Sequence, residues 1–118
     1  MTTTRRPTSE VFDDHLERAR QGDVEGNLEH NYSPDVVLLS AYGVERGRDG
    51  ARRLADLLGR QLPSASFEYV LRQVEGEVAL LEWTAMSEGA RVDDGVDSFV
   101  VRDGRIVAQT IHYTVRPA

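Results

Sequence analysis

The stretch GVDSFVVRDGRIVAQTIHYTV, residues 95–115, contains two strand-like runs joined through an Asp-Gly pair. β-branched and aromatic residues fill both runs, and Asp103-Gly104 suits a type I′ turn because both positions tolerate a positive φ. The stretch therefore predicts an antiparallel hairpin. Polar side chains also occur in it, where a buried strand normally avoids them: Asp97, Gln109, His112 and Tyr113.

The sequence on the N-terminal side of this hairpin predicts three helices and the remaining strands. Helical spacing of apolar residues, with Gly22 and Pro63 as stop signals, predicts helices over residues 8–21, 23–32 and 49–62. Thr8 or Ser9, Asp23 and Asp49 are the expected N-caps. One early strand is expected in VVLLSAYG, followed by a short extended VERG, and three more strands in SFEYVLRQV, EVALLEWTAMS and ARVDDGVDSFVVR.

This element order favours an α+β fold in one domain. We expect a cystatin-like cone in which three N-terminal helices pack on a strongly curved, mostly antiparallel sheet around an internal pocket. The domain should span residues 8–118, and residues 1–7 should form a disordered lead-in. Alternation along the strands places Asp97, Gln109 and Tyr113 inside the cone, unless a bulge near residues 93–95 changes the parity.

Composition excludes several classes of function. The formal net charge of −6 argues against a nucleic-acid surface, and the absence of cysteine excludes disulfides, a thiol nucleophile and thiolate metal sites. No apolar run is long enough to span a bilayer, and the first residues lack the apolar stretch of a secretory signal, so we expect a cytoplasmic protein. The acidic pairs Asp13-Asp14 and Asp93-Asp94 lack a third ligand at useful spacing, so no metal is expected.

Two ionisable residues occupy positions that periodicity assigns to the interior. Asp97 lies on the inward face of its strand, and His15 lies on the apolar stripe of the first helix between Val11 and Ala19. Each would be costly to bury alone, so we predict that the two side chains meet inside the cone. A structural histidine and a structurally paired carboxylate remain alternatives at these positions.

The motifs GD(V)EG, YSPDVVL, GVERGRDGARRL, VALLEWTA and GVDSFVVRDGRIV together resemble the nuclear transport factor 2-like superfamily. Within it, the chain is most similar to the SnoaL-like polyketide-cyclase and ketosteroid-isomerase-like branch, over about residues 8–116. The resemblance implies a cone with a ligand-sized pocket and dimerisation through the outer sheet face. It matches Asp97 to the oxyanion-stabilising Asp of ketosteroid isomerase, His15 to its phenol donor and Ser40 to its general base. Serine cannot replace that base, so steroid isomerisation is in doubt.

Two functions of different classes fit these residues. The first is a cofactor-independent cyclase, isomerase or dehydratase that uses His15 and Asp97 on a small apolar or aromatic substrate with a carbonyl or ring. The second is a non-catalytic ligand-binding or dimeric assembly module with the same pocket. The candidate substrate-binding residues are Trp83, Phe99, Gln109, Tyr113, Ser40 and Tyr42. A homodimer is expected through the small outward residues Ala108, Thr110, His112 and Thr114.

Overall fold

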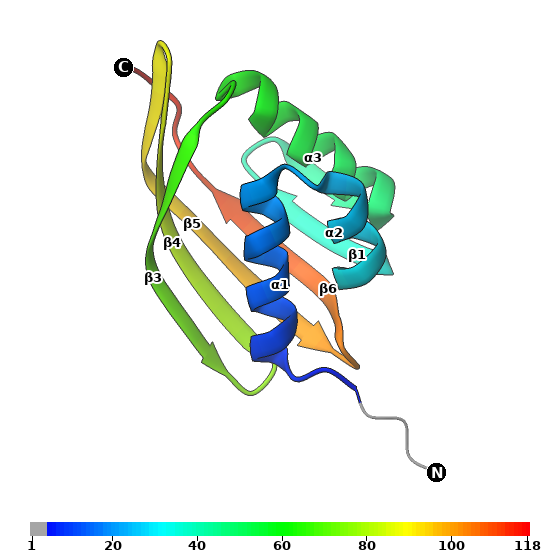
Figure 1. Ribbon diagram of the computed structural model, residues 1–118. Coiled ribbons are helices and arrows are strands. Elements are labelled where there is room, and N and C mark those ends of the chain that lie inside the picture. The colour runs from blue at the N-terminus through cyan, green and yellow to red at the C-terminus, as the bar shows by residue number, and fades with distance from the viewer. Residues whose placement is uncertain (1–4) are drawn as a thin grey trace.

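A strongly curved sheet wraps around the first helix in the computed structural model, which describes residues 5–118 (Figure 1). Helix α1 (Thr8–Gln21) crosses the concave face, and α2 (Val24–Asn31) and α3 (Gly47–Gln61) cover the rest of that side. The predicted α+β cone with three helices is therefore confirmed. Leu16, Leu38 and Ile106, from α1, β1 and β6, belong to the buried hydrophobic cluster between helices and sheet.

The helix ends follow local signals, with two corrections. Asp23 caps α2 as predicted, because its carboxylate accepts a hydrogen bond from the Gly26 N–H, and Gly22 ends α1 with a φ of 74°. The predicted caps of the other two helices are wrong, because Pro7 and Arg46 occupy those positions in extended conformations without side-chain caps. A proline in extended conformation leads into a helix readily because its φ is already close to the helical value.

In the described part of the chain, seven strands form the sheet. Six of them lie in the order β2-β1-β6-β5-β4-β3, and β7 pairs with β5 outside this path. The strands are β1 (Tyr32–Ser40), β2 (Gly43–Arg46), β3 (Ser66–Glu75), β4 (Val78–Ser87), β5 (Ala90–Arg102), β6 (Arg105–His112) and β7 (Arg116–Pro117). Within residues 5–118, β1 and β6 make the single parallel pairing, and every other pairing is antiparallel. The early strand β1 thus pairs with β6, near the end of the chain. The helices α2 and α3, which precede and follow β1 and β2 in sequence, lie over the same concave face.

Two bulges in β5 and β6 decide which side chains face the concave side. Asp93 and Asp94 together oppose Thr84, so Val92 and Gly95 both point inward although they are three residues apart. This is the bulge expected near residues 93–95. A second irregularity lies between the pairs Val100–Ala108 and Val101–Ile106.

The second bulge corrects the sequence reading of β6. Ile106 is fully buried and Val107 is only half-buried, so the inward face does not begin at Val107 as alternation from Gln109 predicted. Alternation resumes beyond the bulge, where Gln109 and Tyr113 face the interior as expected.

The N-terminal residues 5–7 are tied to the domain. The Arg6 guanidinium donates hydrogen bonds to the backbone oxygens of His30 and Gly104 and to the side-chain oxygen of Asn31. The lead-in expected over residues 1–7 therefore falls partly outside the described residues, at positions 1–4, and partly on a segment with specific contacts. Within residues 5–118, no helix combines the length and the apolar character needed to cross a bilayer.

Candidate functional site

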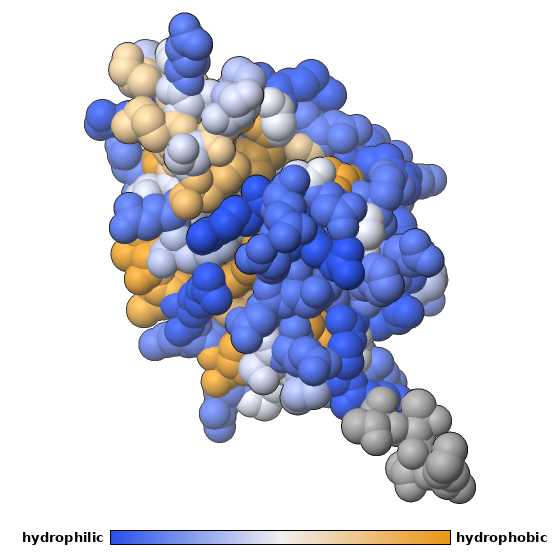
Figure 2. Space-filling view, in the orientation of Figure 1, coloured by the Kyte–Doolittle hydropathy of each residue, from blue (hydrophilic) through white to orange (hydrophobic). Residues whose placement is uncertain are grey.

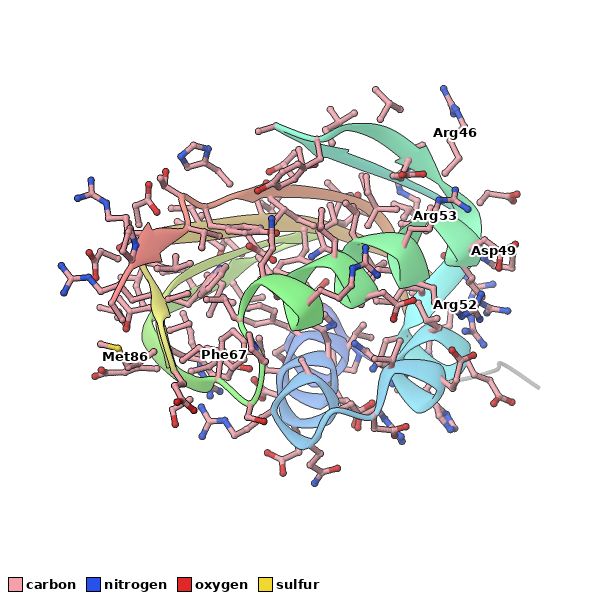
Figure 3. All side chains as sticks on the ribbon, turned by 90° about the horizontal axis from the view of Figure 1, so that it is seen from above. Arg46, Asp49, Arg52, Arg53, Phe67 and Met86 are labelled. Atoms are coloured by element: carbon pink, nitrogen blue, oxygen red, sulfur yellow. The ribbon has the colours of Figure 1, made fainter. Side chains whose placement is uncertain are left out.

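A cavity of about 450 Å³ lies between the concave face of the sheet and the helices. Its walls are mostly apolar and come from all three helices and from β1, β3, β4, β5 and β6. Figure 2 shows hydrophobic surface recessed above the upper end of α1, between that helix and α3. Figure 3, seen from above, shows Phe67, a lining residue of β3, on the side of the molecule away from Arg46. A pocket of this size and composition is typical of small-molecule sites.

Asp97 is a buried carboxylate in the wall of this cavity, held by two donors. Trp83 Nε1–H donates to its Oδ1 over 3.0 Å, and Gln109 Nε2–H donates to its Oδ2 over 3.0 Å. Both donors are diagonal neighbours of Asp97 on the adjoining strands, because Trp83 opposes Gly95 and Gln109 opposes Phe99. Burial raises the pKa of Asp97 to about 6, and the hydrogen bonds from Trp83 and Gln109 act against that rise.

The donors of Asp97 are themselves fixed by their surroundings. The Tyr32 hydroxyl donates to Gln109 Oε1, which turns the amide nitrogen of Gln109 toward the carboxylate. A Cβ at Gly95 would lie 2.3 Å from two indole carbons of Trp83, so only glycine lets the indole lie against β5 and direct Nε1–H to Asp97. The carboxylate is therefore preorganised by groups on three strands and keeps one side toward the cavity.

His15 is held by amides on α2. Asn27 Nδ2 lies 2.9 Å from His15 Nδ1 and Asn27 Oδ1 lies 3.2 Å from it, while Asn31 Nδ2 donates to Asn27 Oδ1 over 2.9 Å. The closer contact is with an N–H donor, so Nδ1 accepts and the ring proton is assigned to Nε2. Burial lowers the pKa of His15 to about 4, against the raising effects of Asn27 and the charge of Asp14. At neutral pH this imidazole is uncharged.

The predicted contact between His15 and Asp97 is wrong. Among the described contacts, no hydrogen bond or ion pair joins the two, and each is satisfied by different partners. The His15 ring instead packs edge-on against Phe99 and Tyr32, with centroids 5.1 and 5.7 Å away. Its Nε2 has no partner among residues 5–118 and is not sealed from solvent, so it faces the cavity that both residues line.

The structure brings five of the six expected substrate-binding residues to the cavity wall: Trp83, Gln109, Tyr113, Ser40 and Tyr42. Tyr113 and Tyr42 are joined through Gln61 of α3, since the Tyr113 hydroxyl donates to Oε1 and Nε2 donates to the Tyr42 hydroxyl. Phe99 is the exception. It is 1% exposed and packs against Phe12 and His15 in the core, so it contacts a residue of the site without lining the cavity itself.

Sequence reasoning missed Asn27 and Tyr32, which hold His15 and Gln109. The amides of Asn27 and Asn31, one turn apart beside Leu28, were a signal that the inner face of α2 has a polar partner. Tyr32 was assigned to the second helix, and its partner lies on β6, 77 residues away. Within residues 5–118, His, Cys, Asp and Glu form no group of three or more that could hold a metal ion.

Comparison with known proteins gives a family match over most of the chain. The family described as the SnoaL-like domain matches residues 12–109. No curated protein matches the chain.

Solved structures share the fold at low sequence identity. A polyketide cyclase candidate from Sinorhizobium meliloti aligns with a TM-score of 0.72 and 20% identity, over 86% of this chain and 93% of that one. A ketosteroid isomerase candidate from Kribbella flavida aligns with a TM-score of 0.76 and 15% identity, over 91% and 77%. A de novo designed protein with a curved β-sheet aligns with a TM-score of 0.74 and 19% identity, over 95% and 88%. These likenesses show the fold and leave the chemistry to the site itself.

Proposed function

This chain belongs to the SnoaL-like domain family, and from that premise we propose that it is a cofactor-independent enzyme acting on a small apolar substrate with a carbonyl group. The reaction class is isomerisation, cyclisation or dehydration next to that carbonyl. The observation that carries the proposal is the pair of buried polar groups, Asp97 and His15, on the wall of one apolar cavity. The cyclase and isomerase descriptions of the Sinorhizobium and Kribbella structures agree with this class.

In this proposal Asp97 is the general base. A pKa of about 6 leaves the carboxylate mostly ionised at neutral pH, yet basic enough to take a proton from a carbon beside a carbonyl. The electron pair of the broken C–H bond then moves to the carbonyl oxygen and forms an enolate. Trp83 and Gln109 hold the carboxylate in place and are the positioning residues of this step.

His15 acts in this proposal as a neutral hydrogen-bond donor. Its Nε2–H is directed to the enolate oxygen, which gains negative charge as the proton leaves carbon. A neutral imidazole suits this role because its depressed pKa prevents a resident positive charge from pairing with Asp97. For isomerisation, the enolate is conjugated with a C=C bond, and protonated Asp97 returns the proton to the far carbon, which shifts the double bond. For cyclisation, the enolate carbon attacks a second carbonyl of the same molecule, and Asp97 gives its proton to the resulting alkoxide. For dehydration, the enolate expels a β-hydroxyl group, which takes the proton from Asp97 and leaves as water.

The test is deuterium exchange at the carbon beside a carbonyl. We expect the protein to catalyse exchange of the α-protons of 2-tetralone in D2O, measured by NMR, with a rate that rises through about pH 6 as Asp97 ionises. Asp97→Asn should reduce the rate to background. Asp35→Asn, the same change at an exposed position, should leave it unchanged.

The second candidate function is ligand binding without catalysis, which the same open cavity favours. Binding of 2-tetralone without exchange, or exchange that persists in Asp97→Asn, would contradict the enzyme. The first of these outcomes would support the binding module.

A further inference from the structure

Arg20 places a guanidinium at the edge of the cavity. It lies in the last turn of α1 and lines the cavity together with Gln21 and Gly22. In the described part of the chain it is the one arginine among the lining residues. The guanidinium carbon lies 4.6 Å from the centroid of the Tyr69 ring, which also lines the cavity. This contact places the guanidinium over the ring of Tyr69, at the solvent-exposed edge of the cavity.

The charge of Arg20 is not neutralised by the protein. Within residues 5–118, no carboxylate lies within 4.0 Å of its guanidinium, whereas Arg18, two residues earlier, pairs with both Asp14 and Asp23. Glu17 on the preceding turn instead accepts a hydrogen bond from Gln21.

The other charged groups near Tyr69 and in the cavity, unlike Arg20, already have partners within the protein. Arg72, whose guanidinium carbon lies 5.2 Å from the centroid of the Tyr69 ring, also lies 3.7 Å from Asp13. Asp97, deeper in the same cavity, is held by Trp83 and Gln109. The mouth of the cavity therefore carries a positive charge in a chain whose net charge is −6.

We propose that the ligand of this cavity is an amphipathic organic anion whose acidic group binds Arg20 at the mouth while its apolar body fills the interior. The inference rests on the proposed function for the carbonyl end of the ligand, which would lie against Asp97 and His15. A free carboxylate, sulfonate or phosphate matches the fork of N–H donors of a guanidinium. The apolar walls separate an anion at the mouth from the Asp97 carboxylate, so Arg20 attracts the anion and Asp97 does not repel it.

Two probes that differ by one acidic group test this assignment. 1-Anilinonaphthalene-8-sulfonate carries a sulfonate, and N-phenyl-1-naphthylamine is the same ring system without it. We expect Arg20→Gln to lower the affinity for the sulfonate probe about 3–10-fold, as for loss of one charge-assisted contact near solvent. The affinity for the neutral probe should change less than about 2-fold. Added salt should lower the affinity for the sulfonate probe only.

The matched control is Arg46→Gln, which removes the same charge from β2. Figure 3 shows Arg46 on the far side of the molecule from Phe67, and its side chain does not line the cavity. Equal effects of the two substitutions on the sulfonate probe would overturn the proposal, as would an equal loss for both probes in Arg20→Gln. If either of these two outcomes is seen but the neutral probe binds, only the role of Arg20 is overturned, and the cavity remains a ligand-binding site. If neither probe binds the unaltered protein, both the cavity ligand and the proposed function are overturned.

Competition identifies the natural class of acidic group. Dodecanoate should displace the neutral probe at lower concentration than dodecanol does, and Arg20→Gln should remove most of this difference. Equal displacement by acid and alcohol in the unaltered protein would contradict an acidic ligand of this kind.

Discussion

Burial acts on Asp97 and His15 in the same physical way and gives them complementary chemistry. It disfavours the charged form of each, which raises the pKa of the acid to about 6 and lowers the pKa of the imidazole to about 4. At neutral pH the wall of the cavity therefore carries both a weakly basic carboxylate and a neutral hydrogen-bond donor. If the two had paired with each other, the carboxylate would have pulled the imidazole toward its charged form, and neither group would be free for a ligand.

The raised pKa of Asp97 predicts a specific dependence of stability on pH. Its folded-state pKa of about 6 exceeds the ordinary value of 3.8, so its contribution to stability is full below about pH 4 and is lost as pH rises through 6. Asp97→Asn removes this loss. We expect the stability of the variant relative to the unaltered protein to increase by up to about 3 kcal/mol between pH 4 and pH 7. Urea denaturation at both pH values measures it.

His15 has the opposite sign and provides the comparison. Its folded-state pKa lies below 6.5, so its contribution to stability is full above pH 6.5 and is lost as pH falls toward 4. His15→Gln should therefore gain relative stability on acidification, where Asp97→Asn loses it. A relative stability of Asp97→Asn that does not change with pH would show that the carboxylate is not held in a charge-disfavouring site.

The tautomer of His15 is a second consequence at this scale. Asn27→Asp replaces the N–H that faces Nδ1 with a carboxylate oxygen, which accepts rather than donates. We expect the proton to appear on Nδ1 and the pKa of His15 to rise from about 4. The ¹⁵N chemical shifts of the imidazole distinguish protonated from unprotonated nitrogens, with exposed His30 and His112 as internal references. A proton already on Nδ1 in the unaltered protein would contradict the assignment.

Individual inward positions could be predicted from the sequence, but their partners could not. Alternation along β5 and helical spacing along α1 were enough to assign Asp97 and His15 to the interior. The donors of Asp97 depend on register, because a shift of one residue would move Trp83 and Gln109 to the outer face. The partner of His15 depends on how α2 packs against α1, a contact that local patterns do not encode.

At the scale of elements, turns were predicted better than bulges. The Asp103-Gly104 turn has φ values of 55° and 77°, as a type I′ hairpin requires, and it follows from residue chemistry alone. The Asp93-Asp94 bulge also had a local signal in its acidic pair next to glycine. The bulge near Val107 lies in an unbroken apolar run, so no local signal marks where the register changes.

Arg6 connects the N-terminal segment, the end of α2 and the β5–β6 turn, so its removal should destabilise the way these elements pack together. It bonds the end of α2 through His30 and Asn31 and the β5–β6 turn through Gly104. Asn31 continues the contact to Asn27, the partner of His15. We expect Arg6→Ala to lower the free energy of unfolding by about 1–3 kcal/mol, because it leaves partly buried oxygens without donors. Thermal and urea denaturation both measure this loss.

The neighbouring Arg5 is the control for this prediction. Its ion pair with Asp103 is largely exposed, so Arg5→Ala should leave the unfolding transition where it is. If both substitutions have the same effect, the N-terminal segment contributes through its general charge and not through the three hydrogen bonds of Arg6.

At the scale of the whole molecule, the cone follows from the order of elements, but its open interior does not. The sequence predicted that Trp83 and Tyr113 line the interior, and these aromatic rings could equally have filled the space. The structure places them along the walls, with Trp83 against Phe67 and Tyr113 at centroid distances of 5.7 and 5.6 Å. Whether a cone is sealed depends on the summed side-chain volumes and on the height of the helices, which no local pattern encodes.

The outer face of the sheet carries an apolar stripe that suits a second copy of the chain. Leu39, Thr110, Ser98 and Leu80 lie in register across four strands, beside Val37, Ala108, Val100 and Val78 in the next row. The hydroxyls of Ser98 and Thr110 hydrogen-bond each other, which pairs the two polar groups of the first row. Leu39 is 47% exposed and Val78 is 53% exposed, although solvent-facing strands normally carry charge.

We therefore predict a homodimer formed by packing of these outer faces, with light scattering at micromolar concentration giving twice the monomer mass. Thr110→Arg places a charge at the centre of the stripe and should yield monomers, because a buried unpaired guanidinium is costly. Val70→Arg, on the edge strand β3, is the control and should leave the dimer intact, since Val70 is 60% exposed and lies outside both rows. A monomer mass for the unaltered protein, or a dimer that survives Thr110→Arg, would rule out this face. Residues of all three helices line the cavity, and these helices cover the opposite, concave face of the sheet (Figure 1), so the monomeric variant should still bind the neutral naphthylamine probe with unchanged affinity.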